Sequence, residues 1–186
     1  MKVEEIELQT LKFPVGKFKV PEAYTNELIH DSKLVIVNFM NVLEPKVKGL
    51  TEEQLSWRYR PNGWTIKQVI HHFADSHMNA FIRFKLALTE DVPIIKPYVE
   101  AAWAELPDSL DNEVEDSLMI LRGLHKRFAK LLENLDAVDL DRKFTHPDWN
   151  KDLPLKMNIC LYAWHCRHHL AHIDNALRSR GIYNKL

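Results

Sequence analysis

The chain has little glycine and almost no net charge. It holds five glycines in 186 residues, and no glycine-rich phosphate-binding loop occurs. Its formal net charge of −1 at pH 7 provides none of the broad positive field that nucleic-acid binding usually requires. The same balance gives no reason to expect an anionic membrane surface as a partner. We therefore expect neither nucleic acid nor a membrane among its partners.

Long apolar runs are also missing. No stretch approaches the ~18–20 residues of a membrane span, and the acidic N-terminus lacks the apolar segment of a signal peptide. A cytoplasmic protein is therefore expected. Hydrophobic residues at 46% and charged residues at 27% are ordinary for a soluble globular protein. The length suits one domain with a proper core, so residues 1–186 are predicted to form a single domain.

The two cysteines, Cys160 and Cys166, both lie near the C-terminus. If this segment is helical, six residues separate them by ~9 Å of rise, and their side chains point to different sides. A disulfide needs Cα atoms within ~7 Å, so both are expected to stay reduced. Cys166 points away from the neighbouring histidines, which favours a buried thiol over a metal ligand.

Hydrophobic residues repeat with a period of 3.6 residues over long stretches, which predicts an all-α fold. The clearest helix start is Thr65-Ile66-Lys67-Gln68, where Thr and Gln can form a capping box. A proline-rich, aromatic connection over 93–107 is expected to cross the bundle. The prediction is a four-helix bundle with this long crossover and short extra turns. Its parts are an extended N-terminal arm over 1–21, helices over 22–43, from 65 to before Pro93, over 112–134 and over 155–180, a short helical turn at 51–54 and a short hairpin within 144–150.

Four histidines lie within eight residues of the last predicted helix. At ~100° per residue they share an arc of roughly 100°, and charged residues occupy the opposite side. Burying several polar rings without partners costs free energy, so a shared metal ion explains them better than four separate core hydrogen bonds. The four are His165, His168, His169 and His172.

The spacing alone leaves the ligand set open. Two pairs have the four-residue spacing that places side chains on one helix face: His165 with His169, and His168 with His172. His71 and His72 flank the apolar face of the second long helix, and either can supply a third nitrogen. The remaining histidines carry no such signal. We expect His77 in the core as a hydrogen-bonded residue, His30 and His125 on helix surfaces, and His146 in a turn.

Three imidazoles with an open coordination position are typical of a catalytic zinc-type site. His-Glu-x-x-His is absent, and the Glu-x-x-His motif that a di-iron bundle needs twice occurs only at Glu27–His30. The serine-hydrolase motif Gly-x-Ser-x-Gly is absent too. Histidine-rich, carboxylate-poor ligation suits zinc, nickel, copper or iron and disfavours magnesium and calcium.

The segment over 63–79, GWTIKQVIHHFADSHMN, resembles the YfiT-type metal-dependent hydrolases. These belong to the DinB-like superfamily, whose members include bacillithiol and other thiol S-transferases. The resemblance runs from about Phe13 to Arg178. Further matching motifs are RFKL at 83–86, PY at 97–98, WAEL at 103–106, WH at 164–165 and HHLAH at 168–172.

The resemblance implies a cytoplasmic homodimer with one nickel or zinc ion per chain. One histidine of the second long helix and two of the fourth would hold the ion. Carried over by position, these ligands are His72, His168 and His172.

The expected function is that of a mononuclear metal enzyme acting on an electrophilic small molecule. The ion would activate water in a hydrolase, or a low-molecular-weight, bacillithiol-like thiol in an S-transferase. Asp75 and His165 are candidates to orient ligands or to shuttle a proton. The alternative is a non-catalytic metal-binding stress-response protein, in which a fourth protein ligand would close the coordination sphere.

Overall fold

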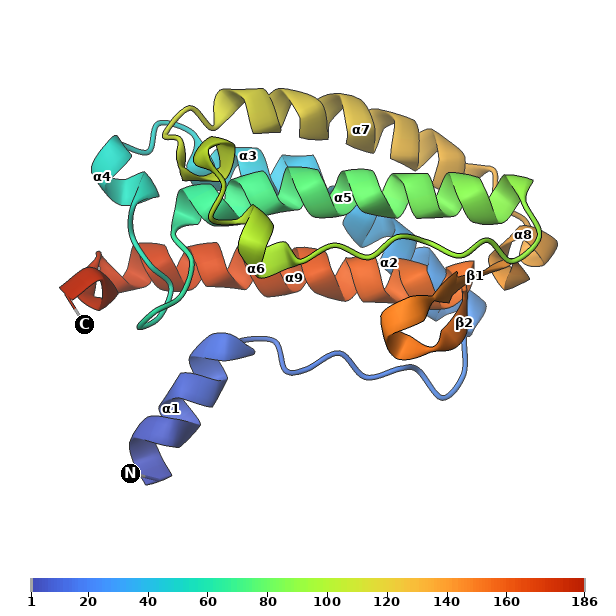
Figure 1. The fold of residues 1–186 in the computed structure, drawn as a ribbon, viewed down its shortest axis with the longest axis horizontal. Coiled ribbons are helices and arrows are strands. Elements are labelled where there is room, and N and C mark those ends of the chain that lie inside the picture. The colour runs from blue at the N-terminus through green and yellow to red at the C-terminus, as the bar shows by residue number, and fades with distance from the viewer. Residues whose placement is uncertain (1, 186) are drawn as a thin grey trace.

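The computed structural model describes residues 2–185. Its long helices pack side by side in a bundle, and the N-terminal helix stands apart from them (Figure 1). The bundle consists of α2 (Asn26–Val37) continued by α3 (Phe39–Val47), α5 (Ile66–Thr89), α7 (Glu115–Glu133) and α9 (Leu155–Ser179). The other elements are α1 (Lys2–Lys12), α4 (Glu52–Leu55), α6 (Glu100–Trp103), α8 (Ala137–Asp141), strands β1 (Lys143–His146) and β2 (Lys151–Pro154), and 3-10 turns at Pro107–Leu110, Pro147–Trp149 and Ile182–Lys185.

The predicted all-α four-helix bundle with a long crossover is confirmed. Helix α5 begins at the expected capping box, in which Gln68 N donates to Thr65 Oγ1 at 3.4 Å and Thr65 N donates to Gln68 Oε1 at 3.0 Å. These bonds satisfy two backbone donors that the first turn leaves free. Within residues 2–185, no helix has both the length and the apolar character needed to cross a membrane.

Two predictions about the N-terminal part are wrong. Lys2–Lys12 form helix α1, so the extended arm predicted over 1–21 exists only from Phe13 onward, and Met1 lies outside the described residues. The first bundle helix does not run unbroken over 22–43. It starts at Asn26, where Thr25 Oγ1 accepts from Leu28 N, and it is interrupted at Asn38. Helical periodicity did not show either feature, because it locates a helix better than it locates the ends and breaks of that helix.

A short antiparallel hairpin forms where turn residues predicted it. Phe144 pairs with Leu153, and His146 pairs with Lys151. The crossover runs beside β1: Thr145 N donates to Pro93 O at 2.9 Å, and Ile95 N donates to Thr145 O at 3.1 Å. The hairpin thus anchors one end of the crossover to the bundle.

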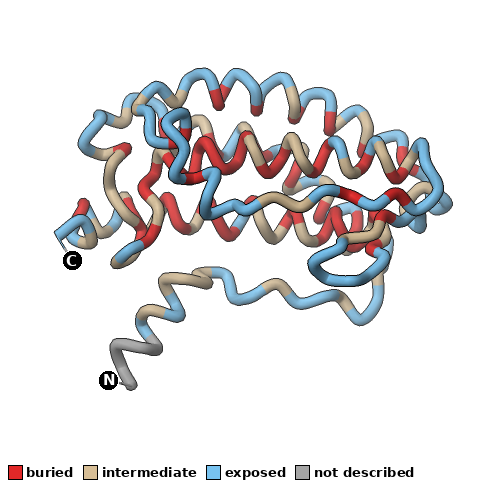
Figure 2. Tube along the Cα trace, viewed as in Figure 1, coloured by how far each residue is buried: buried red, intermediate tan, exposed pale blue. Residues whose placement is uncertain are grey.

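The bundle interior contains two apolar clusters with a polar layer between them. Figure 2 shows in red the buried positions that recur along the long helices. One cluster includes Phe84 and Phe128, and the other includes Phe39 and Phe73. The polar layer lies at the middle of the long helices, and its side chains are all buried. It consists of His77 of α5, His125 of α7 and Cys166 of α9.

A single hydrogen-bond chain runs through this polar layer. His125 Nδ1 donates to Ile36 O of α2 at 2.9 Å. In a neutral ring His125 Nε2 is then an acceptor, and it accepts from His77 Nδ1 at 2.7 Å. His77 Nε2 in turn lies 3.9 Å from Cys166 Sγ and can accept a hydrogen bond from the thiol. The chain joins all four parts of the bundle, so the prediction of His125 as a surface residue is wrong; His77 is a core residue as expected.

His125→Leu is expected to lower the free energy of unfolding by about 3 kcal/mol, because it strands two buried polar partners, Ile36 O and His77 Nδ1. Urea denaturation checks this. His30→Leu is the matched control, since His30 is exposed on α2 and its replacement should change stability by less than about 0.5 kcal/mol. Equal stabilities for the two variants would contradict the role of the layer.

The metal-free protein is expected to lose stability as the pH falls from about 6.5 to about 4. Burial lowers the pKa of His125 from 6.5 to about 4 and that of His77 well below 6.5, so the unfolded chain binds more protons in this window. Asp75 has the opposite effect, because burial raises its pKa to about 6 and the folded protein therefore binds its proton first. It is one group against two histidines, so it does not reverse the trend. Denaturation midpoints between pH 8 and pH 4 measure the trend. A flat profile would show that these histidines are not buried as neutral rings.

Candidate functional site

A cavity of about 830 Å³ lies against α5 and α9. Its walls also include the end of α1, the loop before α5, the crossover and the hairpin. Aromatic rings form much of the lining, including Tyr59, Trp64, Tyr98, Trp149 and Trp164. A concave, largely aromatic site with a few polar groups is the usual form of a small-molecule site.

Five histidines gather at one end of this cavity. His72 lies near the start of α5, and the other four lie on the second half of α9, which runs alongside it (Figure 1). The four on α9, which also line the cavity, are His165, His168, His169 and His172. The shared inward arc predicted for these four rings is therefore present.

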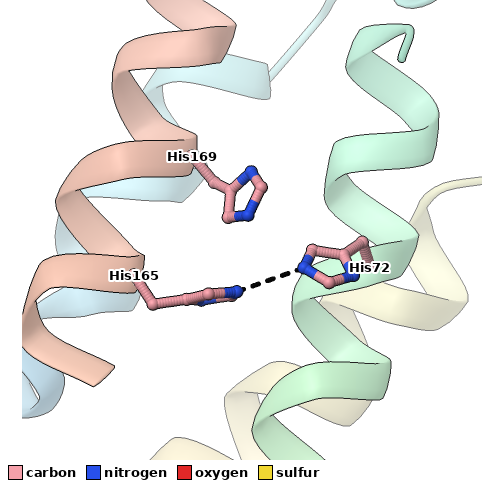
Figure 3. Close-up of side chains that lie close together, drawn as sticks. All are labelled: His72, His165 and His169. Atoms are coloured by element: carbon pink, nitrogen blue, oxygen red, sulfur yellow. Dashed lines mark hydrogen bonds between the residues drawn. The ribbon is translucent and has the colours of Figure 1, made fainter. Parts of the chain in front are cut away.

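His72, His165 and His169 form one group of possible ligands (Figure 3). Each offers one nitrogen, and the three nitrogens lie within 4.8 Å of one another. His72 Nε2 and His165 Nε2 are 3.1 Å apart, and Ser76 Oγ is 3.4 Å from the same His165 atom. The group takes its nitrogens from two helices, as the sequence predicted for the site.

His168, His169 and His172 form a second group, also within 4.8 Å. His172 Nε2 donates to Lys12 O at 3.2 Å, so its Nδ1 is an acceptor for His169 Nδ1 at 3.2 Å. This arrangement leaves the Nε2 lone pair of His169 free. Tyr59 stacks on the His172 ring at 3.8 Å, and Trp164 stacks on His168 at 4.4 Å.

Burial keeps these rings neutral. It lowers the pKa of His72 and of His168 from 6.5 to about 4, and His168 adds to the effect on His72. Burial and the neighbouring His168 lower the pKa of His172 to about 3. The pKa values of His165 and His169 fall well below 6.5, through burial first and then neighbouring histidines. Neutral imidazole is the form that binds a metal, so no proton needs to leave at neutral pH.

The structure shows which residue of the His71-His72 pair faces the site. His71 turns toward α7, where its Nδ1 lies 2.8 Å from Ser117 Oγ and its Nε2 lies 3.2 Å from Asp111 O. Both of its nitrogens are therefore engaged away from the cavity. The predicted ligands His72, His168 and His172 all belong to the five-histidine cluster, but their nitrogens do not form one group within 4.8 Å.

The two candidate orienting residues differ in position. His165 lies inside the histidine cluster and lines the cavity. Asp75 is half-buried, is not among the cavity-lining residues, and has a pKa raised to about 6 by burial and by Asp108. A role for Asp75 at the ion stays a prediction.

Sequence reasoning missed the polar residues at the far end of the cavity. Arg83, Tyr98 and Asn158 line it there, together with His146, which the sequence placed in a turn. Arg83 and Asn158 are polar residues on otherwise buried faces of α5 and α9, which is the one signal that could have marked them.

Known proteins match this chain along most of its length. A family model described as the DinB superfamily matches residues 40–173. A Bacillus cereus (strain AH820) protein named "Putative metal-dependent hydrolase" is 48% identical over 173 residues, covering 93% of this chain and 98% of that protein. A Bacillus anthracis protein of the same name matches to the same extent, at 48% identity.

A solved structure extends the comparison to three dimensions. YfiT from Bacillus subtilis, described as "a probable metal-dependent hydrolase with an unusual four-helix bundle topology", superposes with a TM-score of 0.88 at 42% identity. The match covers 92% of this chain and 98% of that chain. The chain therefore belongs to the DinB superfamily and is a YfiT-type member of it.

Proposed function

We propose that this protein is a metal-dependent hydrolase with one divalent transition metal bound at the five-histidine cluster. The observation that carries the proposal is the convergence of neutral imidazoles from α5 and α9 at the wall of a large cavity. The names of the matched relatives support it independently, since they describe metal-dependent hydrolases.

The residues present fit such an ion. His72 Nε2 and His165 Nε2 face each other at 3.1 Å, close to the roughly 3.3 Å between two nitrogens that share a tetrahedral zinc ion. In neutral rings one of these nitrogens can donate a hydrogen bond to the other, or, with both lone pairs free, the two can bind one cation. Both groups of nitrogens lack a carboxylate, so the chemistry supports nickel or zinc over magnesium or calcium.

Two pairs on α9 can complete a site with His72. His165 and His169 are supported by distance, because their nitrogens already lie within 4.8 Å of the His72 nitrogen. His168 and His172 are supported by the family resemblance, and His168 is close enough to lower the pKa of His72.

A divalent ion at this cluster would supply a Lewis acid that lowers the pKa of a bound water or thiol toward neutrality. The chain's own residues prepare the place. Lys12 O and His172 fix the tautomer of His169, so that its Nε2 lone pair stays available. The stacked rings of Tyr59 and Trp164 hold His172 and His168 in position and exclude water from their faces.

Thiol transfer is the second candidate function. The cavity of about 830 Å³ is near the upper end of the range for small-molecule sites, so it has room for a small thiol together with an electrophile. In that reaction the thiolate would replace water as the nucleophile.

Nickel- or zinc-loaded protein is expected to hydrolyse 4-nitrophenyl acetate roughly tenfold or more faster than metal-stripped protein, because the ion generates a nucleophile at neutral pH. His72→Ala treated with the same metal is the control. A parallel assay with glutathione and 1-chloro-2,4-dinitrobenzene tests thiol transfer. Equal rates with and without metal in both assays, together with four protein ligands in X-ray absorption spectra, would favour the non-catalytic alternative.

Elemental analysis of alanine variants identifies the ligands. His72→Ala is expected to lose the metal, because His72 belongs to both proposed sets that combine one histidine of α5 with a pair on α9. Of His165→Ala and His168→Ala, only one should lose it, and that result names the pair. His71→Ala is the control and should keep a full complement of metal. Retention of stoichiometric metal by His72→Ala would contradict the site.

A further inference from the structure

Unpaired polar atoms concentrate in the cavity. Among the side chains of residues 7–185, seven buried nitrogen or oxygen atoms have no hydrogen-bond partner within the protein, and all seven belong to cavity-lining residues. Buried polar groups are normally paired, so unpaired atoms gathered in one cavity indicate a place where a ligand or bound water supplies their partners. Three lie on Arg60, His165 and His168. The other four are Arg83 Nε, Tyr98 Oη, His146 Nδ1 and Asn158 Nδ2.

The last four of these residues come from four separate elements. Arg83 lies on α5, Tyr98 on the crossover, His146 on β1 and Asn158 on α9. The backbone pairing of the crossover with β1 holds two of these elements together. Burial lowers the pKa of His146, and Arg83 lies close enough to lower it further. The four side chains therefore form one polar end of the cavity.

We propose that this polar end is a carboxylate-binding subsite for the substrate that reacts at the histidine cluster, an inference that rests on the proposed function. Arg83 carries the charge, and its buried Nε can bind a carboxylate in the two-point geometry that guanidinium groups favour. Asn158, only 1% exposed, adds an unpaired amide donor. The Tyr98 hydroxyl adds a third donor group. Burial is the main cause of its raised pKa, so the hydroxyl stays protonated.

No carboxylate forms a salt bridge with Arg83 among the side chains of residues 7–185. Glu100 and Asp148 also line the cavity. Burial raises the pKa of Glu100, and the nearby Arg83 offsets part of this rise. Since these two carboxylates repel further negative charge, the subsite suits a single carboxylate rather than a polyanion.

The helices set the length of the substrate. Asn158 precedes His165 by seven residues on α9, which is about 10 Å of helix rise. Arg83 follows His72 by eleven residues on α5, or about 16 Å. Aromatic residues line the cavity, among them Tyr98 and Trp149. The substrate class is therefore an elongated monocarboxylate with an apolar or aromatic body and its reactive group on the order of 10–16 Å from the carboxylate.

Isothermal titration of the metal-free protein with 4-phenylbutyrate and with its neutral amide, 4-phenylbutyramide, tests the subsite. The acid is expected to bind roughly tenfold or more tightly than the amide, as one charge-assisted hydrogen-bond pair predicts. Arg83→Gln should reduce binding of the acid to the level of the amide. Asn158→Leu, which replaces the amide with an apolar side chain of similar size, should also weaken binding of the acid.

Lys85→Gln is the matched control, because it removes a positive charge from the same helix outside the cavity. Its affinity for the acid should equal that of the unmodified protein, and circular dichroism verifies that each variant is folded. Equal binding of acid and amide, or unchanged binding by Arg83→Gln, would overturn the proposal. Because no metal is present in this titration, that failure is distinct from a failure to bind metal or to hydrolyse esters.

Discussion

The burial of uncharged imidazole rings between the long helices is the constraint on which the interior depends. A neutral ring has one donor and one acceptor nitrogen, so each buried ring needs a directed set of partners. In the middle of the bundle, Ile36 O fixes His125, and His125 fixes His77. At the cavity, Lys12 O fixes His172, and His172 fixes His169. Backbone carbonyls thus determine where the remaining lone pairs point.

The two histidine systems differ in how completely they are satisfied. The chain through His77 and His125 begins at a thiol and ends at a carbonyl, and it joins the helices as a structural layer. The cavity residues include every unpaired buried side-chain nitrogen or oxygen found in residues 7–185. A protein bears the cost of unpaired buried groups where a ligand will pair them. Stability and function therefore use the same residue type in adjacent regions.

The connections complete the site that the helices begin. Helices α5 and α9 supply the histidines, Arg83 and Asn158. The crossover and the hairpin supply Tyr98 and His146, and the end of α1 supplies Lys12. The metal chemistry would then depend on the rigid helices, whereas selection among substrates would depend on segments that vary more easily in length and sequence.

The sequence by itself determined the three long helices α5, α7 and α9, the capping box at Thr65 and the inward arc of histidines on α9, because helical periodicity and capping are local properties. The tertiary structure alone decided that His71 turns to Ser117 while His72 turns to His165. It also decided that His125 is buried and that Arg83 lies close enough to His146 to affect its pKa. Periodicity places a side chain on a helix face, but its partner on another helix depends on how the helices rotate and pack against one another.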